Sequence, residues 1–314
     1  MRNKKKRTLG DIIWKLVFMI ALAVFLYCGY RLVIIFLEYK LGSDEYASLE
    51  QQYIQDDWGT VEPETKKQEV ATDSSESAGS EAQGLDTEKY VPDEPETEAE
   101  TETEIIEDEK GNVKVNYYPI MRNPVDFAKL QEVNEDIVGW IRVNALGISY
   151  PITQGEDNDY YLHRTFEGVE NFAGCIFMEY QNNSDLTDKN TIIYGHNMKN
   201  GSMFGKLKQF KEEGVYDSNP YFWIYTPEKV YRYDIFSCAE VGVFGDTYQI
   251  SFVDDEAFMK FVDNAKARSV VDGSWVEVTE EDSVVTLSTC TGNDATRFVV
   301  QGKLGKVYKA YRLD

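Results

Sequence analysis

A long apolar run near the N-terminus constrains the fold of this chain more than any other feature of its sequence. The run extends from Leu16 to Leu37 and contains a single charged residue, Arg31. About 20 apolar residues are enough for a helix to cross a bilayer, and an arginine near its end can extend to the interface. A basic cluster precedes the run: Arg2, Lys4, Lys5, Lys6 and Arg7. Because cytoplasmic flanks carry an excess of Lys and Arg, we predict a single-pass protein of the cell membrane with a cytoplasmic N-terminus and an extracellular bulk.

Two other interpretations of the run are open. A cleavable signal peptide has a shorter apolar core that ends in small residues, whereas here the chain stays bulky and apolar from Leu32 to Phe36. A buried helix of a soluble protein would not need the basic cluster. We therefore expect residues 1–40 to form a cytoplasmic basic tail and a retained transmembrane anchor.

Charge is distributed unevenly along the chain. Residues 1–40 carry eight Lys and Arg against two Asp and Glu, whereas residues 41–116 carry five against 23. From Asp86 to Glu109, 12 of 24 residues are acidic, and such a segment cannot bury enough apolar surface to offset the entropy of ordering it. We predict that residues 41–116 form an extracellular acidic linker, largely disordered, that holds a domain away from the membrane; Ser43–Gln55 can extend the anchor helix. The net charge of −23 repels phosphate backbones, so nucleic acid is not an expected partner.

Residues 117–314 have the pattern of a folded, mostly β domain. Short apolar or alternating runs predict strands at 138–143, 148–153, 174–178, 191–194, 221–226, 230–241, 283–289, 297–303 and 307–312. Asn123-Pro124 predicts the start of a short helix, and further helices are predicted over Ser202–Phe210 and Asp254–Arg268. Many short strands and few helices in roughly 200 residues predict a closed β-barrel with helical insertions.

This domain holds both histidines and three of the four cysteines, which narrows the choice of reactive groups. Cys175 and Cys238 lie in apolar, strand-like runs, where a small buried hydrophobic role is expected, and Cys28 lies inside the N-terminal apolar run. Only Cys290 lies in a polar, turn-like segment. A lone cysteine is more often a structural thiol than a nucleophile, so a catalytic role for Cys290 depends on which residues lie near it.

His196, Cys290 and Arg297 each lie at an end of a predicted strand. A thiol needs a base or a positive neighbour to act as a nucleophile at neutral pH, and histidine and arginine supply both. If Cys290 and Arg297 lie on adjacent antiparallel strands, the guanidinium can reach an oxyanion at the carbon that the thiol attacks. Taken singly, His196 can be a turn residue and Arg297 a surface ion-pair partner. The combination makes the three a candidate catalytic set.

Three motifs around these residues resemble the catalytic motifs of sortases, specifically those of class B. They are Tyr194-Gly195-His196-Asn197-Met198, Thr286-Leu287-Ser288-Thr289-Cys290-Thr291 and Arg297-Phe298-Val299-Val300. The similarity extends from Phe127 to Leu313 and takes in further segments: 137–141, 158–162, 174–178 and 201–204. The helix predicted over 254–268 is similar to the helical insertion of class B.

The resemblance implies a membrane-anchored cysteine transpeptidase with a sortase-type β-barrel on the surface of a Gram-positive bacterium. Cys290 would attack the carbonyl after Thr in a C-terminal sorting motif of a secreted protein, and Arg297 would stabilise the oxyanion. His196 would protonate the leaving amine and then deprotonate the incoming one, from a cell-wall precursor or a pilin. No metal or organic cofactor is required. By the same likeness, three residues contact the sorting peptide: Asn158, Leu162 and Ser288.

Some features depart from the family pattern or leave alternatives open. The loop between Cys290 and Arg297 is short for class B, and Cys175 stands where a small non-thiol residue is commoner. His163 is expected to be a partly exposed structural residue. A cysteine peptidase would hydrolyse the same bond with the same residues, although the papain order of Cys before His is not met. A non-catalytic surface-binding domain also fits the anchor and the β domain, but it has no need of the three motifs.

Overall fold

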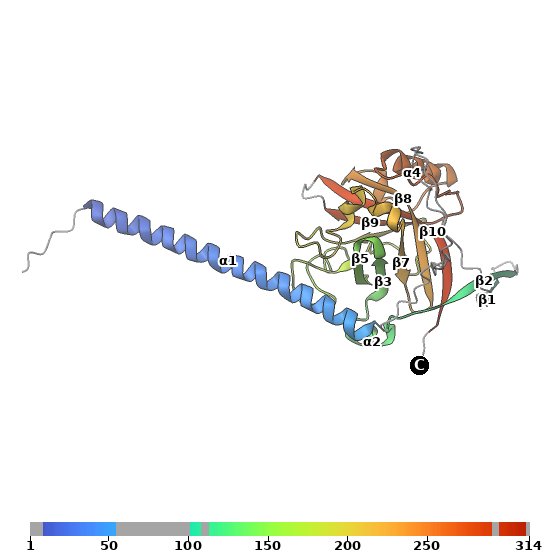
Figure 1. Ribbon diagram of the computed structural model, residues 1–314, viewed down its shortest axis with the longest axis horizontal. Helices are drawn as coiled ribbons and strands as arrows, with labels where there is room; N and C mark the ends of the chain where they lie inside the picture. The colour runs from blue at the N-terminus through green and yellow to red at the C-terminus, as the bar shows by residue number, and fades with distance from the viewer. Residues whose placement is uncertain (1–8, 55–100, 108–112, 291–294, 312–314) are drawn as a thin grey trace, which may run out of the picture.

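The computed structural model describes residues 9–54, 101–107, 113–290 and 295–311. A long N-terminal helix leads to a β-barrel that carries short helices (Figure 1). The predicted basic tail before Leu9 lies outside the described residues, as do residues 55–100 of the predicted linker and residues 291–294.

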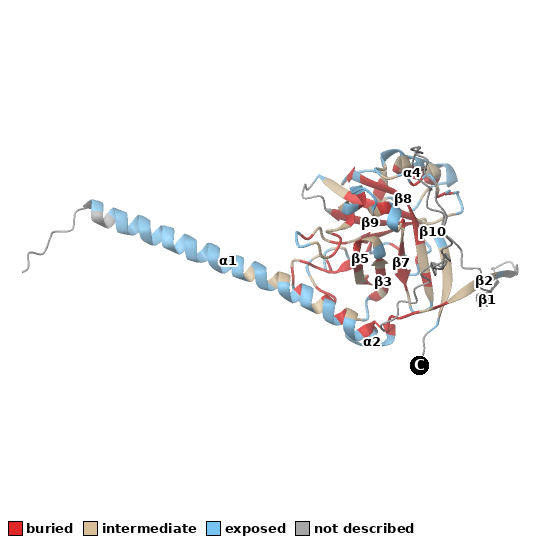
Figure 2. Cartoon of the chain, in the orientation of Figure 1, coloured by how far each residue is buried: buried red, intermediate tan, exposed pale blue. Residues whose placement is uncertain are grey.

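Helix α1, Leu9–Tyr53, contains the predicted transmembrane run. Its large apolar side chains between Ile13 and Leu41 are mostly exposed, as Figure 2 shows along the projecting part of the helix. The helix is long and apolar enough to cross a membrane, which fits an anchor and a signal sequence alike. The orientation of the chain across a membrane stays a prediction.

The C-terminal end of α1 packs against the barrel domain. Tyr46, Leu49 and Tyr53 are 5%, 2% and 7% exposed. The Tyr46 hydroxyl donates a hydrogen bond to the carbonyl oxygen of Gly174 at 2.8 Å, and the amide of Asp126 donates to the Tyr53 carbonyl at 2.9 Å. The end of the helix and the domain therefore touch directly. Residues 55–100 of the predicted linker lie outside the described residues, so the prediction that it holds the domain away from the membrane stays a prediction.

Two strands lie inside the range predicted to be a largely disordered linker. β1, Thr101–Glu107, pairs antiparallel with β2, Val113–Arg122, and the end of β2 pairs in parallel with the barrel strand β10, Thr296–Tyr311. The acidic composition hid this hairpin, because an edge strand paired through its backbone tolerates charged side chains and needs little buried apolar surface. The predicted domain boundary at residue 117 falls within β2.

Eight strands close the barrel in the order β10-β8-β7-β3-β4-β5-β6-β9, and β9 pairs back to β10. Their bounds are β3 Ile137–Val143, β4 Ile148–Thr153, β5 Ile176–Met178, β6 Asn190–Tyr194, β7 Tyr221–Tyr225, β8 Lys229–Gly242, β9 Val284–Cys290 and β10 Thr296–Tyr311. Large side chains fill the interior, among them the fully buried Trp140, Phe166 and Phe204, so the barrel is a packed core. The predicted closed, mostly β fold is confirmed.

Helix α4, Asp255–Arg268, agrees with its prediction. The carboxylate of Asp254 caps it by accepting from the amide of Ala257 at 2.8 Å. One face is buried against the barrel side of the domain: Phe258, Phe261, Val262 and Ala265. The other short helical segments are η1 Asn144–Leu146, α3 Val215–Ser218 and η3 Asp246–Tyr248.

The other two helix predictions need correction. Helix α2 is Phe127–Val133, with Asp126 as its N-cap. The Asn123 side chain accepts from the amide of Val125 at 3.1 Å, so Asn123-Pro124 forms a turn ahead of the helix rather than its start. Of the helix predicted over 202–210, only the end is helical, as the 3-10 segment η2, Leu207–Lys211.

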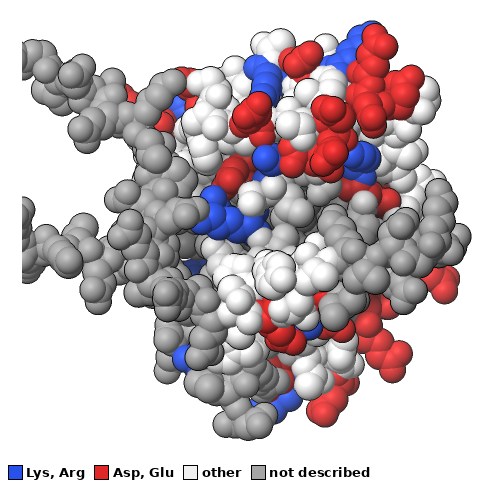
Figure 3. All heavy atoms as spheres, turned by 90° about the vertical axis from the view of Figure 1, so that its right-hand side faces the viewer, with Lys and Arg blue, Asp and Glu red and all other residues white. Residues whose placement is uncertain are grey.

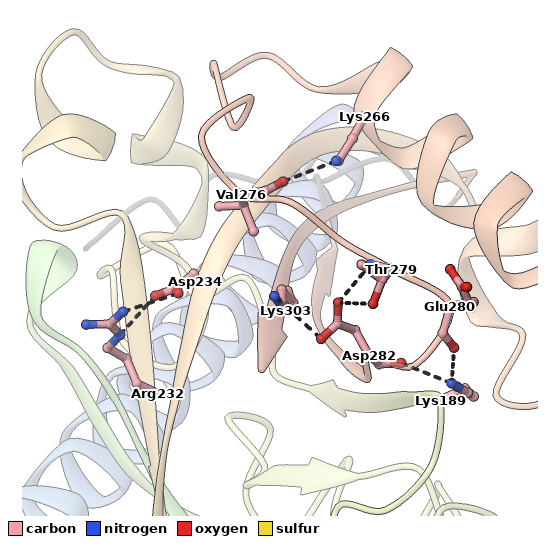
Figure 4. Close-up of polar contacts among 9 residues, drawn as sticks. All are labelled: Lys189, Arg232, Asp234, Lys266, Val276, Thr279, Glu280, Asp282 and Lys303. Atoms are coloured by element: carbon pink, nitrogen blue, oxygen red, sulfur yellow. Dashed lines mark hydrogen bonds and ion pairs between the residues drawn. The ribbon is translucent and has the colours of Figure 1, made fainter. Parts of the chain in front are cut away.

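β10 is one strand where two were predicted. Its register against β8 shifts between Leu304 and Lys306. Gly305 lies at this irregularity, and a Cβ there would come within 2.2 Å of Asp234 Oδ2. Figure 4 shows that Arg232 holds this carboxylate in place, with Nη2 donating at 3.2 Å. The glycine interrupts the apolar pattern without ending the strand.

The loop before β9 is fixed by a set of polar contacts (Figure 4). Lys189, which precedes β6, donates to the carbonyl oxygens of Glu280 and Asp282. The Asp282 carboxylate accepts from the Thr279 amide at 2.7 Å and lies 3.5 Å from the ammonium of Lys303 on β10. These contacts hold the start of β9 between its two neighbours, so the strand delivers its last residue, Cys290, at the other end.

The acidic character of the chain is visible on its surface. On the face in Figure 3, Asp and Glu side chains gather towards the top and the bottom of the domain, and Lys and Arg side chains lie among and between them. Residues 117–314 carry 19 Lys and Arg against 30 Asp and Glu, and such an excess of negative charge repels polyanions. That nucleic acid is not a partner stays a prediction.

Candidate active site

Three neighbouring strands bring the predicted catalytic positions to one end of the barrel. In the antiparallel pair of β9 and β10, Cys290 lies directly opposite Arg297. β6 runs parallel to β9, with Tyr194 beside Ser288. His196 follows Tyr194 by two residues and Cys290 follows Ser288 by two, so the register brings His196 to the level of Cys290. The structure therefore groups the three predicted positions by strand register.

The backbone of His196 is held on both sides. The amide of Gly195 donates to the Ser288 carbonyl at 3.1 Å, and the His196 carbonyl accepts from Phe204 at 3.1 Å. A Cβ at Gly195 would lie 2.5 Å from Ile176 Cδ1 and 2.7 Å from the Phe204 ring, so only glycine fits between the strand and the histidine. Close packing thus accounts for the Gly-His pair of the motif.

The imidazole of His196 has a defined hydrogen bond. Its Nε2 lies 2.7 Å from the backbone carbonyl oxygen of Leu162. Because a carbonyl only accepts, Nε2 carries the proton and Nδ1 is the accepting nitrogen of the neutral ring. Burial lowers the pKa of His196, and His163, whose ring centroid is 6.4 Å away, lowers it further, against the effect of the Leu162 carbonyl. The neutral, basic form is therefore favoured at neutral pH.

Arg297 is half-buried at the start of β10. Its Nη1 donates to the backbone carbonyl of Thr296 at 2.9 Å, which orients the guanidinium beside the strand end. The guanidinium of Arg297 therefore supplies a positive charge across from Cys290.

The three residues predicted to contact the peptide lie on different elements of the structure: Asn158 and Leu162 between β4 and β5, and Ser288 on β9. Leu162 reaches the site through its backbone, which bonds His196. Ser288 is 2% exposed on β9, and its hydroxyl shares a hydrogen bond with the Tyr248 hydroxyl at 2.9 Å. Asn158 is half-buried on the loop between β4 and β5, and its Nδ2 donates to Glu179 Oε2 at 2.7 Å.

Comparison with known proteins decides the family. The sortase domain profile matches residues 141–305. Sortase B of Listeria monocytogenes is 39% identical over 180 residues, which cover 56% of this chain and 72% of that protein. Sortase B of Staphylococcus aureus is 32% identical over 184 residues, covering 58% and 75%. This chain belongs to the sortase family. It is a cysteine transpeptidase of that family, and its relatives carry the name sortase B.

Solved structures agree with this assignment. The Staphylococcus aureus sortase B–substrate complex superposes with a TM-score of 0.54 at 32% identity, covering 57% of this chain and 84% of that chain. Sortase B from Bacillus anthracis in complex with AAEK1 superposes with a TM-score of 0.54 at 34% identity, covering 65% and 90%. The closed barrel of this enzyme is thus the sortase fold.

The remaining cysteines of the domain are structural. Cys175 and Cys238 are both fully buried. Burial raises the pKa of the Cys175 thiol to about 12, and it raises that of Cys238 as well. Both stay protonated at neutral pH, which confirms their interpretation as small hydrophobic groups. Cys28 is exposed on the apolar part of α1.

The structure adds polar residues near the site that the sequence did not single out. Glu179, Tyr194 and Tyr248 connect the loop of Asn158 to β6 and to Ser288. Tyr194 lies inside the histidine motif, and Glu179 directly follows a fully buried strand, where a charged residue is itself unusual. Among the described residues, no group of His, Cys, Asp and Glu is placed to hold a metal ion. The expectation that no metal or cofactor is needed stays a prediction.

Proposed function

We propose that this sortase cleaves a C-terminal sorting motif of secreted proteins after Thr, through a thioester on Cys290, and transfers the acyl group to an amine of a cell-wall precursor or a pilin. One observation carries the proposal: Cys290 lies opposite Arg297 on the paired strands, and His196 leaves β6 at the same end. The roles of these three residues follow from the chemistry that each can perform there.

In the first half-reaction, His196 takes the thiol proton of Cys290, and the sulfur attacks the carbonyl carbon of the threonine. The carbonyl oxygen becomes an oxyanion, which the guanidinium of Arg297 stabilises. The carbon–nitrogen bond then breaks, His196 returns the proton to the leaving amine, and the acyl group stays on sulfur as a thioester. The lowered pKa of His196 supports this scheme, because the first proton transfer needs a neutral imidazole.

In the second half-reaction, an incoming amine attacks the thioester carbon. His196 accepts a proton from that amine, Arg297 again stabilises the oxyanion, and the sulfur leaves and recovers a proton from His196. The covalent intermediate divides one difficult amide exchange into two easier steps. Water in place of the amine would give hydrolysis of the same bond, which is the alternative enzyme activity.

The sorting peptide would lie beside Asn158, Leu162 and Ser288. Two of the three are connected to the candidate catalytic residues. The carbonyl oxygen of Leu162 accepts a hydrogen bond from His196, and Ser288 lies two residues before Cys290 on β9. The backbone of Leu162 would then serve both the histidine and the groove.

We place the anchor of this enzyme in the cell membrane, with the basic N-terminus in the cytoplasm and the catalytic domain outside. The exposed apolar surface of α1 and the basic flank in the sequence support this orientation. Because the end of α1 packs on the domain, the catalytic end of the barrel would keep a fixed distance from the membrane.

Full-length enzyme in detergent micelles, incubated with sorting-type peptides and with or without an amine, tests the proposal by mass spectrometry of the products. We expect a ligated product that requires the amine and Cys290, and that His196→Ala and Arg297→Ala each reduce strongly. Cys28→Ala is the matched control and should leave ligation unchanged.

The alternatives predict other results. Cleavage at a rate that ignores the amine and yields only the free acid would identify a hydrolase with the same catalytic residues. Peptide binding that Cys290→Ala leaves unchanged, with no product from the wild type, would identify a non-catalytic surface-binding domain.

A further inference from the structure

Glu179 is a buried carboxylate beside the candidate peptide site. It follows β5 directly and is 8% exposed. Its Oε2 accepts hydrogen bonds from Asn158 Nδ2 at 2.7 Å and from the Tyr194 hydroxyl at 2.9 Å. Burying a carboxylate is unfavourable unless hydrogen bonds compensate for the lost water, so a carboxylate at this position calls for an explanation.

The contacts of Glu179 fix which way the Asn158 amide faces. A carboxylate only accepts, so Asn158 must present its NH₂ group to Glu179. The Asn158 oxygen in turn accepts from the backbone amide of Tyr180 at 3.1 Å. With both ends of the amide held by adjacent residues of one segment, a flipped amide would set oxygen against oxygen and nitrogen against N–H. One N–H of the Asn158 NH₂ group donates to Glu179, which leaves the second N–H for another acceptor.

The same carboxylate also holds Tyr194, two residues before His196. Burial and the charge of Glu179 raise the pKa of Tyr194, so the phenol stays neutral and donates. The Tyr194 ring stacks on Tyr248 with centroids 6.3 Å apart and planes 17° apart, and the Tyr248 hydroxyl bonds the Ser288 hydroxyl at 2.9 Å. One buried acceptor thus connects Asn158 to the tyrosine stack that reaches Ser288.

We propose that Glu179 is a positioning residue for the sorting peptide: it holds the Asn158 amide in the orientation that presents the second N–H of Nδ2 to the peptide. This inference rests on the proposed function, because it assigns a support to one of its peptide contacts. In this proposal Glu179 acts through Asn158. An amide at position 179 would fill the same volume, but it could donate as well as accept, so only the Tyr180 backbone amide would still dictate which way Asn158 faces.

The test separates peptide recognition from the chemistry at Cys290. In full-length enzyme, kcat and KM for acylation by a sorting-type peptide are measured beside the rate at which iodoacetamide alkylates Cys290, which needs no peptide. Glu179→Gln is expected to lower kcat/KM about tenfold to a hundredfold, the range for a lost hydrogen bond to a charged group, mainly through KM. Alkylation should stay within about twofold of the wild type. Glu156→Gln is the matched control, because Glu156 is exposed on the loop that carries Asn158 and its replacement should change neither value.

A double-mutant cycle and an exchange variant test the route through Asn158. Added to Asn158→Ala, Glu179→Gln should have no further effect on kcat/KM beyond about twofold, since the residue that it positions is gone. The exchange Glu179→Gln with Asn158→Asp reverses donor and acceptor, so it should keep the wild-type melting temperature but not restore KM, because the new carboxylate has no N–H for the peptide.

Each contrary result overturns a defined statement. Parallel losses of peptide acylation and alkylation in Glu179→Gln would show a general structural role. Additive losses in the double variant, or recovery of KM in the exchange variant, would show that Glu179 does not act by orienting the Asn158 N–H. Unchanged kinetics in Glu179→Gln would overturn this inference alone, whereas a wild type that forms no acyl adduct with any peptide would overturn the proposed function with it.

Discussion

Replacing Leu49 by alanine tests whether α1 is docked on the catalytic domain as the structure describes. Leu49 is 2% exposed on the face of α1 that packs against the barrel domain. Truncating a buried leucine costs about 2–5 kcal/mol, through the lost burial of the side chain and the cavity that remains. The matched control is Leu41→Ala on the same helix, because Leu41 is 65% exposed and its truncation should cost little.

Amide hydrogen exchange of the full-length enzyme in detergent measures this cost locally. Amides from Tyr46 to Tyr53 exchange when the helix end opens, so their rates follow the free energy of opening. A loss of about 2 kcal/mol raises those rates roughly 30-fold, and larger losses raise them further, since 1.36 kcal/mol corresponds to a factor of ten. The amides around Gly174 should also exchange faster, because the Tyr46 hydroxyl bonds its carbonyl.

Equal exchange in Leu49→Ala, Leu41→Ala and the wild type would refute the docking of α1. So would a wild type whose helix end exchanges as fast as an isolated helix. Either result would mean that the end of α1 is not held against the domain.

Three further predictions concern the catalytic end of the barrel. The folded-state pKa of His196 lies below its unfolded value, so the protein should lose stability as the pH falls from about 6.5 through the lowered value. Denaturant titrations across that pH range should show a smaller loss of stability for His196→Gln than for the wild type. Gly195→Ala should cost about 1–3 kcal/mol and reduce turnover, because its Cβ would lie 2.5 Å from Ile176 Cδ1, whereas Gly242→Ala, with 3.5 Å to its nearest atom, should be close to neutral in melting and activity assays. Arg297→Lys keeps the charge but loses the planar fork, so kcat should fall by roughly 10²-fold with a smaller change in KM, and an equal rise in KM would contradict its role at the oxyanion.

Local signals in the sequence were sufficient for much of the barrel. The hairpin of β3 and β4 and the helix α4 were predicted closely, because alternation, the Asp254 cap and the apolar face of α4 are set by nearby residues. β10 was divided in two because Gly305 breaks its pattern, and the reason for the glycine is Asp234 on a neighbouring strand. A contact between two strands of a sheet leaves no pattern in the sequence around Gly305 from which it could be predicted.

The docking of α1 had a signal that the acidic surroundings concealed. Tyr46, Leu49 and Tyr53 recur at intervals of three and four, which is the spacing of a buried helix face. The candidate catalytic positions could be named from their motifs, whereas their alignment follows from the register of β6, β9 and β10. The contacts of Glu179 bring together residues 21 and 15 positions away, which no sequence pattern specifies.

Detection of an acyl-enzyme by mass spectrometry tests the central claim most directly. Full-length enzyme is mixed with a sorting-type peptide in the absence of amine, digested, and searched for the acyl mass on each cysteine. We predict an adduct on Cys290 that ends in the threonine of the motif, that hydroxylamine removes, and that Arg297→Ala greatly reduces. An adduct on Cys28 would contradict thioester chemistry at Cys290. So would cleavage of the peptide without any adduct that hydroxylamine removes.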